Sequence, residues 1–485
     1  MNPGAICCRP LCGAARLLRI AVVGLAACWM IAGFRCLHAA ERRPNIVFIL
    51  IDDMGWRDGG CFGSTFYRTP ELDRLARSGM RFTQAYASCA VCSPTRAAIM
   101  TGKAPARLHI TDWIAGEGTP KESRFRVPDW QKKLPLSEVT LAEALKPLGF
   151  TSAAIGKWHL GPPDCYPQHQ GFDVNVAGGH IGHPASYFWP YGAEGASHRV
   201  PGLAEAGGSK GEYLTDRLTD EALKFIEKCK GKPFFLYLAH YAVHSPLMAK
   251  EELLKAAESQ TPADGQSNAV YAAMLRSVDE SVGRILNRLD ALGLTKDTIV
   301  IFTSDNGGAV HFGKPPATSN RPLRLGKGYP YEGGLRVPLL VRVPGVTPPG
   351  SICDVPVISH DFFPTLLELV GADQPASATA IDGVSWAPLL RGGRLPERPL
   401  FWHYPHYWNG KGVTPYSVIR DGDWKLIRFY ESNREEVYNL REDPGESTDL
   451  AEREPGGRRA LALRLDAWLK EVGAQMPVPR SASGP

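Results

Sequence analysis

Cys92 opens the run CSPTR, which puts a cysteine, a proline and an arginine close together in the chain. Pro94 is typical of the first turn of a helix and Ser93 of the cap before it, so we expect a helix over 95–101 that Gly102 ends. The free N–H groups and the dipole at a helix N-terminus attract an anion. A cysteine held there can have a low pKa and act as a nucleophile. The alternative is a buried, inert cysteine beside an ordinary helix.

Two pairs of residues with side-chain oxygens follow candidate strands. Asp52 and Asp53 come directly after the apolar run 46–51, and Asp305 and Asn306 come directly after a second apolar run. In an open α/β sheet, ligands bind beyond the carboxyl ends of the strands, so we expect these side chains to meet. Three carboxylates and one amide oxygen suit Ca²⁺ or Mg²⁺ better than zinc. Either pair alone is also consistent with a turn.

Lysine and histidine follow two further candidate strands. The segment GKWHLG, with Lys157 and His159, comes after a short strand pattern, and His240 and His244 come after the apolar run FFLYLA. Two histidines four residues apart could bind a metal from one face of a helix, but the proline that follows them favours a loop. For Lys157 the alternative is a surface lysine, and His240 could be a structural residue.

Taken together, these segments resemble the sulfatase family. The match includes Cys-x-Pro-x-Arg at Cys92, the GKWHLG segment and the run KGYPYEGGLRVP that begins at Lys327, in the family's order from residue 44 to residue 338. The resemblance is to formylglycine-dependent type I sulfatases, which are arylsulfatase-like enzymes of the alkaline phosphatase superfamily. The style of the motifs is similar to that of bacterial secreted polysaccharide sulfatases.

The resemblance implies a reaction and the residues for it. A formylglycine-generating maturation enzyme would oxidise Cys92, and the hydrated aldehyde would attack the sulfur of a sulfate ester. Lys157 and Lys327 would hold sulfate oxygens. His244 would protonate the leaving alcohol, and His159 would accept a proton when sulfate is expelled. The residues implied in catalysis are Cys92, Arg96, Lys157, His159, His244 and Lys327. One Ca²⁺ would be held by Asp52, Asp53, Asp305, Asn306 and the formylglycine oxygen at Cys92.

Residues 1–40 carry the pattern of a signal peptide. Arginines flank an apolar run over 20–34, and small residues follow at 39–40. A membrane anchor is the alternative, but the run is short for a bilayer span and no later run replaces it. We therefore expect an exported protein, periplasmic or secreted, without a stable membrane span.

The whole chain of 485 residues has a globular composition, with 44% hydrophobic and 22% charged residues. Its formal net charge of +5 comes partly from the arginines of the leader. No basic stripe with interleaved aromatic residues is present, so we expect no nucleic acid partner.

Continuous apolar runs alternate with helical patterns along the chain. The runs over 46–51, 234–239 and 298–303 are typical of buried parallel strands, so the pattern predicts an α/β fold with a large, mostly parallel sheet flanked by helices. The resemblance implies an alkaline-phosphatase-like sandwich. We expect a catalytic domain over 41–395 and an α+β subdomain over 396–485, built from a small antiparallel sheet with a helix.

Two loops offer aromatic and histidine side chains that could hold a sugar. We expect a sulfated carbohydrate or an aryl sulfate as substrate, and attack at the end of a glycan chain, because long loops would build a pocket. The alternative is that these side chains pack the C-terminal sheet against the main domain. The candidate substrate-binding residues are His183 in the loop 178–183, and His403 and His406 in the segment 402–407.

Two other functions fit parts of the pattern. Some phosphonate or phosphodiester hydrolases of the same superfamily carry the same cysteine motif, and a secreted glycan-binding homologue could lack activity. The two lysines and the GKWHLG segment favour sulfate, and the complete set of metal and catalytic residues favours an enzyme.

Overall fold

The structure, a computed structural model, describes residues 1, 4, 43–203, 205–311, 313–375 and 378–480. The predicted signal peptide over 1–40 lies outside the described residues, apart from Met1 and Gly4. Pro44–Pro485 forms one compact unit. Within the described residues, no helix combines the length and the apolar character that crossing a membrane requires.

The described residues form a main sheet of nine strands. Its order is β10-β2-β8-β7-β1-β6-β4-β5, with β9 beside β2. Strand β8 runs antiparallel to β2 and β7, and the other pairs are parallel, which confirms the predicted mostly parallel sheet. The strands are β1 Asn45–Ile51, β2 Met80–Tyr86, β4 Thr151–Gly156, β5 Val174–Val176, β6 Phe234–Ala239, β7 Thr298–Ser304, β8 Arg336–Arg342, β9 Ser351–Cys353 and β10 Val357–Ile358.

Strand β1 is buried on both faces, which explains its unbroken apolar sequence. Successive side chains of a strand point to opposite faces. Val47 and Ile49 accordingly belong to one hydrophobic cluster, whereas Ile46 and Phe48 belong to another. The sheet therefore separates two cores.

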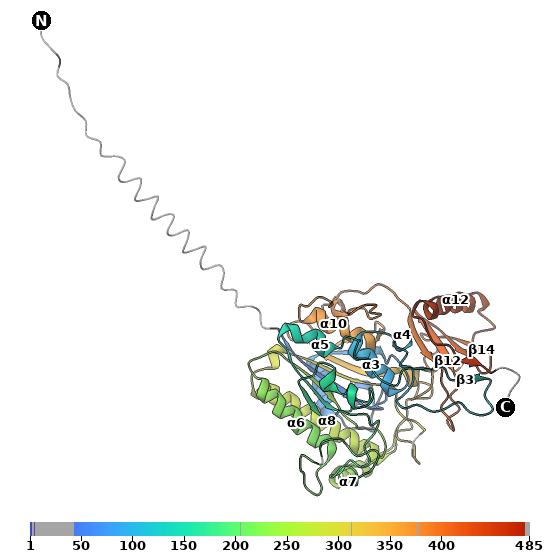
Figure 1. The fold of residues 1–485 in the computed structure, drawn as a ribbon, viewed down its shortest axis with the longest axis horizontal. Helices are drawn as coiled ribbons and strands as arrows, with labels where there is room; N and C mark the ends of the chain where they lie inside the picture. The colour runs from blue at the N-terminus through green and yellow to red at the C-terminus, as the bar shows by residue number, and fades with distance from the viewer. Residues whose placement is uncertain (2–3, 5–42, 204, 312, 376–377, 481–485) are drawn as a thin grey trace. The chain divides into compact units, whose positions relative to one another are not determined.

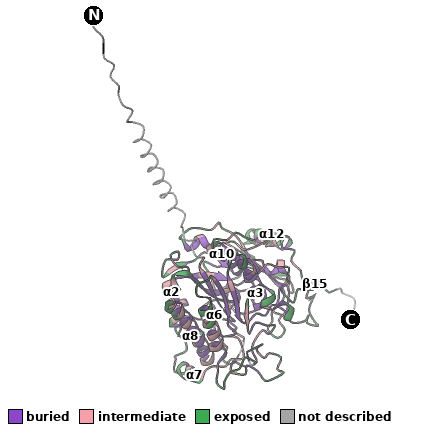
Figure 2. Ribbon diagram, turned by 60° about the vertical axis from the view of Figure 1, so that its left-hand side comes forward, coloured by how far each residue is buried: buried purple, intermediate pink, exposed green. Residues whose placement is uncertain are grey.

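Helices cover both faces of this sheet (Figure 1). Helices α2, α6 and α8 pack into the core that contains Val47, and α5 and α10 pack into the core that contains Ile46. In Figure 2 the strands are buried, and exposed residues lie on the outer faces of helices such as α7 and α12. The helices are α2 Pro70–Ser78, α3 Cys92–Thr101, α4 Pro105–Leu108, α5 Leu141–Leu145, α6 Leu214–Cys229, α7 Glu251–Glu258, α8 Ala269–Ala291, α9 Glu332–Leu335, α10 Phe362–Leu369, α11 Ala387–Leu390 and α12 Pro455–Glu471.

The last part of the chain forms an antiparallel sheet with α12 packed on it, as predicted. Leu461 and Leu465 of α12 share a hydrophobic cluster with this sheet. Residues 402–404, expected in a loop, instead belong to its edge strand, where Trp402 and Tyr404 are buried. The strands in order are β11 Leu400–Tyr404, β12 Tyr416–Asp421, β13 Trp424–Phe429 and β14 Arg434–Asn439, and a separate pair joins β3 Phe125–Arg126 to β15 Val478–Pro479.

Buried ion pairs connect the C-terminal sheet to the segment that precedes β8. Nζ of Lys425 on β13 lies 3.0 Å from a carboxylate oxygen of Glu332 and 2.7 Å from one of Glu446, and all three residues are buried. Glu332 begins α9 and also pairs with Arg336 at 2.8 Å. Removing one partner would leave a buried charge uncompensated, at a cost of about 3–5 kcal/mol. These ion pairs attach the C-terminal sheet to the segment that precedes β8.

Candidate active site

Four neighbouring parallel strands, β7, β1, β6 and β4, end at one edge of the main sheet. Asp52 and Asp53 follow β1, Asp305 and Asn306 follow β7, and Lys157 follows β4. Residues that are far apart in the sequence therefore meet at this edge, where ligands bind in such sheets.

Cys92 is the first residue of α3, so the helix begins earlier than predicted. Ser93, expected to cap the helix, lies inside it. Its hydroxyl donates to the His159 carbonyl at 2.9 Å and accepts from the Ile114 N–H at 3.1 Å. The capping prediction is wrong because this side chain connects two loops instead. Gly102 follows the last helical residue, as predicted, with a φ of 71° in the left-handed region.

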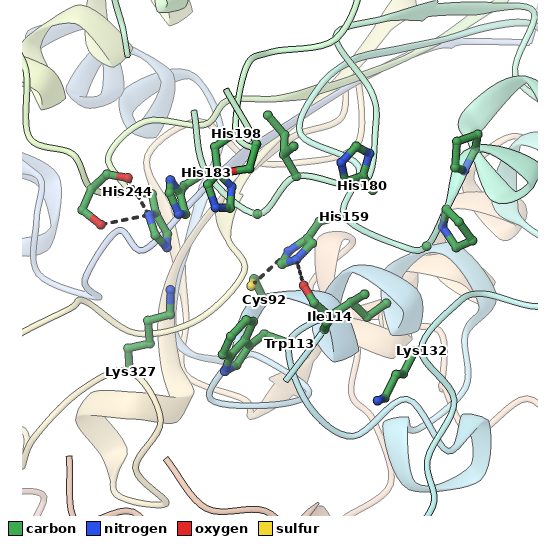
Figure 3. A pocket seen from close by; sticks show the side chains of 18 of the residues that line it. Cys92, Trp113, Ile114, Lys132, His159, His180, His183, His198, His244 and Lys327 are labelled. Carbon is green, nitrogen blue, oxygen red and sulfur yellow. Dashed lines mark hydrogen bonds between the residues drawn. The ribbon is translucent and has the colours of Figure 1, made fainter. Parts of the chain in front are cut away.

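The Cys92 thiol faces His159 at the wall of a cavity (Figure 3). Sγ lies 3.4 Å from Nδ1 of His159, and the Ile114 carbonyl accepts a hydrogen bond from Nε2 of the same ring. With its proton on Nε2, the neutral ring presents Nδ1 as a base toward residue 92. Burial raises the pKa of the Cys92 thiol, although Lys157 and Lys327 oppose this shift. The expectation of a low-pKa thiolate is therefore wrong for the unmodified residue.

Two buried lysines reach the acidic residues. Nζ of Lys157 lies 2.7 Å from Oδ2 of Asp52, and Nζ of Lys327 lies 2.7 Å from Oδ1 of Asp53. Burial alone would raise the pKa of Asp53, but Lys327 and His244 hold it below its usual value. The structure thus brings both predicted sulfate lysines to the predicted metal site.

Arg96 lies one turn into α3 and is buried against Asp305. Its Nε donates to Oδ2 of Asp305 at 2.8 Å, and Nη1 donates to the Lys157 carbonyl at 2.9 Å. The opposite oxygen of Asp305 accepts from the Asp53 N–H at 3.2 Å. Arg96 does not line the cavity, so its contacts suit it to positioning Asp305 rather than to touching a substrate.

The acidic cluster has the donor set of a hard cation. Oδ1 of Asp52 and Oδ1 of Asn306 are buried and have no hydrogen-bond partner. Ligand atoms of Asp52, Asp53 and His244 lie within 4.8 Å of one another. Burial raises the pKa of Asp52, and a divalent cation would favour its carboxylate again. Because buried oxygens without a partner are costly, these residues fit an oxygen-coordinated ion such as Ca²⁺.

His244 follows β6 and faces the acidic cluster. Its Nε2 lies 3.6 Å from Oδ2 of Asp53, and its Nδ1 lies 2.9 Å from the Ser245 carbonyl. That carbonyl keeps a proton on Nδ1, so a second proton would sit on Nε2. Burial and Lys327 lower the pKa of His244, and a bound anion would raise it again. His240, in contrast, bonds a serine of α8 at 3.0 Å and does not line the cavity, which indicates a structural role.

The cavity beside Cys92 has a volume of about 860 Å³. The His183 ring stacks on His198 with centroids 4.0 Å apart and on His244 with centroids 5.5 Å apart. His183 is therefore next to the proposed reacting centre (Figure 3). Further lining residues that the sequence motifs did not assign are Trp113, Ile114, Lys132, His180, His198 and Trp408.

The structure does not bring His403 and His406 to this cavity. Both are buried, and Nδ1 of His403 lies 2.7 Å from Oγ of Ser417. Nε2 of His406 lies 2.8 Å from Oγ1 of Thr111, a residue of the main domain. They take the packing role that the alternative interpretation gave them.

Residues 44–372 match the model of the sulfatase family. The chain belongs to the sulfatase family. The sulfatase also matches the C-terminal region of N-sulphoglucosamine sulphohydrolase over residues 325–472. It is 36% identical over 383 residues to the N-acetylgalactosamine-6-sulfatase of Mus musculus, covering 75% of this chain and 69% of that protein. A sulfatase of Formosa agariphila is 33% identical over 528 residues and 93% of each chain.

The fold agrees with that of solved sulfatases. The crystal structure of Ps i-CgsB in complex with k-i-k-neocarrahexaose is similar to this sulfatase with a TM-score of 0.73 and 28% identity, over 91% of this chain and 96% of that one. The predicted alkaline-phosphatase-like fold is confirmed. The family and its curated members also confirm that the protein is a sulfuric ester hydrolase.

Proposed function

We propose that this sulfatase hydrolyses sulfate esters of carbohydrates, with a formylglycine made from Cys92 and one Ca²⁺ bound beside it. The observation that carries the proposal is the convergence on Cys92. His159, two lysines and the acidic cluster come from separate strand ends and loops, and they surround one side chain at the wall of a cavity.

Two groups would complete this site. One Ca²⁺ would be held by Asp52, Asp53, Asp305, Asn306 and residue 92, and it would neutralise negative charge on the sulfate. Formylglycine supplies, as its hydrate, one hydroxyl for attack and a second through which sulfate can leave. A serine would instead form a sulfate ester that only water could remove, which explains why a modified cysteine is needed.

The lysines supply the positive charge that a sulfate ester needs. Nζ of Lys157 and Nζ of Lys327 lie at the acidic cluster, and both lysines act electrostatically on residue 92, so they bind sulfate oxygens and stabilise charge that develops on them. Arg96 keeps Asp305 in place through Nε.

Two histidines move protons at defined atoms. Nδ1 of His159 faces residue 92 and accepts a proton from it, because the Ile114 carbonyl holds the other ring proton on Nε2. His244 donates from Nε2 to the oxygen of the leaving alcohol, since its Nδ1 is engaged with the Ser245 carbonyl.

The substrate that the site fits best is a sulfated sugar at the end of a glycan chain. The volume of the cavity is in the range of pockets that enclose most of a ligand. The rings of His183 and His198 line the cavity and offer polar and aromatic contacts to a sugar. Relatives are named for sulfated N-acetylgalactosamine, and a similar structure holds a neocarrahexaose. The signal-peptide pattern supports export to the periplasm or the exterior, where such glycans occur.

Peptide mass spectrometry tests the modification. Trypsin releases the peptide 82–96, which contains both Cys89 and Cys92. After co-expression with a formylglycine-generating enzyme, Cys89 should react with an alkylating reagent and residue 92 should have the mass of formylglycine. A fully active preparation in which residue 92 is an unmodified cysteine would overturn the proposal.

Substrate panels test the rest. Sulfate should be released from sulfated monosaccharides and short oligosaccharides, and aryl sulfates should be cleaved much faster than aryl phosphodiesters. Release from internal units of a polymer alone would contradict end attack. Faster cleavage of the phosphodiester would favour the phosphodiesterase alternative.

A further inference from the structure

One short loop segment contacts both of the histidines that move protons. His159 follows β4 and His244 follows β6, whereas Gly182 and His183 are adjacent residues of the loop after β5. All four residues line the cavity. Two catalytic side chains from different strand ends therefore have the same dipeptide as a neighbour.

Gly182 lies against the ring of His159. A Cβ atom at position 182 would be 2.7 Å from Cε1 and 2.9 Å from Nε2 of that ring, closer than Cβ atoms approach other heavy atoms in proteins. The buried ring cannot easily move away, because the Ile114 carbonyl accepts from Nε2 and Nδ1 faces Cys92. The lack of a side chain at residue 182 therefore allows the His159 ring to lie where it does.

His183 lies beside the ring of His244. The two ring planes differ by 6° and the centroids are 5.5 Å apart, as in offset aromatic pairs. His183 is held in turn by the ring of His198, with centroids 4.0 Å apart, and by the Pro184 carbonyl, which accepts from its Nδ1 at 3.1 Å. Figure 3 shows His183 between His244 and His198. This stack limits the rotation of the His244 ring.

We propose that Gly182 and His183 are positioning residues for the two proton transfers. Gly182 leaves space for the His159 ring beside residue 92, and His183 keeps Nε2 of His244 directed toward the leaving alcohol. The proposal rests on the proposed function, because it acts through the histidines that carry the two proton transfers there. A displacement of this one dipeptide would disturb both transfers.

The first test is Gly182→Ala, with Gly178→Ala as its matched control. A Cβ atom at position 178 would be as crowded, 2.4 Å from Oδ1 of Asn175, but its three nearest atoms belong to Asn175 and Pro167. Gly182→Ala should lower kcat about tenfold, because it displaces His159 by several tenths of an ångström and a shift of about 1 Å can cost about 100-fold. Gly178→Ala should keep the wild-type kcat.

The choice of substrate shows which transfer is affected. His159 acts at residue 92 when sulfate is expelled, after the alcohol has left. The loss in Gly182→Ala should therefore be at least as large with 4-nitrophenyl sulfate as with a sulfated monosaccharide.

Crystal structures of the unmodified protein test the same point without turnover. In Gly182→Ala, Nδ1 of His159 should lie farther from Sγ of Cys92 than the 3.4 Å of the wild type. In Gly178→Ala the ring should keep its place.

The second test compares His183→Ala with His183→Phe. Phenylalanine keeps a ring beside His244 but lacks the polar nitrogens, so both variants should have a raised KM for a sulfated sugar. Only His183→Ala should also lower kcat, about tenfold. This loss should be larger with the sulfated sugar than with 4-nitrophenyl sulfate, because His244 serves the leaving group.

The outcomes separate the positioning roles from the function itself. A wild-type kcat with an undisplaced ring in Gly182→Ala overturns the role of Gly182, as does an equal fall of kcat in Gly178→Ala. A wild-type kcat in His183→Ala, or an equal fall in His183→Phe, overturns the role of His183. If the matured wild type hydrolyses neither 4-nitrophenyl sulfate nor any sulfated sugar, the proposed function fails instead, and the crystal structures alone then decide whether Gly182 sets the position of His159.

Discussion

The acidic cluster and its two lysines form the floor of the site, where Nζ of Lys157 and Nζ of Lys327 each lie 2.7 Å from a buried carboxylate. Lys132, on the cavity wall, has no acidic partner among the described residues. The floor is built at the carboxyl ends of strands, and its charges are paired with one another. The outer wall is built from loops, and it holds half-exposed histidines such as His183 and His198. We infer that the paired charges of the floor hold the reacting sulfate in one position. The polar side chains of the wall can bind the rest of the substrate and thereby determine which substrate is accepted. Four predictions test this division, from the largest effect to the smallest.

Removing the nucleophile from the floor of the site should abolish catalysis. Cys92→Ala should lower sulfate release by about three orders of magnitude or more, because no other group can take over the attack. The fold should persist, since the change removes one sulfur atom at a helix start. Sulfate release and the melting temperature measure the two effects. Cys89→Ala, in the same segment, is the matched control and should retain most activity; a similar loss there would indicate a packing effect.

Removing the metal should have a comparable effect. Treatment with a calcium chelator should abolish sulfate release and lower the melting temperature, because the ion binds only the folded site and its absence leaves the buried Oδ1 atoms of Asp52 and Asn306 without a partner. Added Ca²⁺ should restore both. Asp52→Asn should weaken the response to Ca²⁺. Elemental analysis that finds stoichiometric zinc and no calcium would contradict the assignment.

The loss of activity on replacing His244 should depend on how basic the leaving group of the substrate is. A sugar alkoxide needs a proton in the transition state, whereas nitrophenolate does not, so His244→Ala should slow a sulfated sugar by about 10²–10⁴-fold. The loss with 4-nitrophenyl sulfate should be much smaller. Steady-state kinetics on both substrates gives the answer, and equal losses would remove the proton-donor role.

Replacing His183 and replacing His403, both candidate substrate-binding residues from the sequence, should affect different properties of the enzyme. His183→Ala should raise KM for a sulfated sugar about tenfold and leave the melting temperature unchanged, because His183 is half-exposed in the cavity. His403→Ala should instead lower the free energy of unfolding by about 1–3 kcal/mol, because it removes the hydrogen bonds of a buried imidazole to the Ser417 hydroxyl and the Gln475 carbonyl. Unchanged KM in the first variant, or a raised KM with unchanged stability in the second, would reverse these assignments.

The fold was predictable where strands are buried on both faces. The runs at β1, β6 and β7 are continuous and apolar, so the sequence alone predicted them. Strand β2 was missed because its sequence MRFTQAY is mixed and its register shifts between Phe82 and Ala85. Strand β11 was missed because its histidine and aromatic residues were taken for a binding loop.

The site was predictable only in part, for a related reason. Residues such as Asp52 and Lys157 directly follow strands, so the positions of the strands place them. Lys132 and His198 lie in loops, whose paths depend on tertiary contacts such as the stacking of His183 on His198. For His198, the signal in the sequence was the length of the segment 161–211 and its content of glycine, proline and histidine, whereas no motif pointed to Lys132.

The ion pairs of Lys425 bear on how such a chain can be inactivated. Glu332 follows Lys327 closely in the sequence, and it is neutralised by a residue of the C-terminal sheet. A chain that ended before β11, or a sheet released by a protease that cuts near residues 391–396, would leave Glu332 without Lys425, with Arg336 as its remaining cation. The segment that carries Lys327 would then lose its support. Cleavage near residues 391–396 would then abolish sulfate release, although every catalytic residue would remain in the N-terminal fragment.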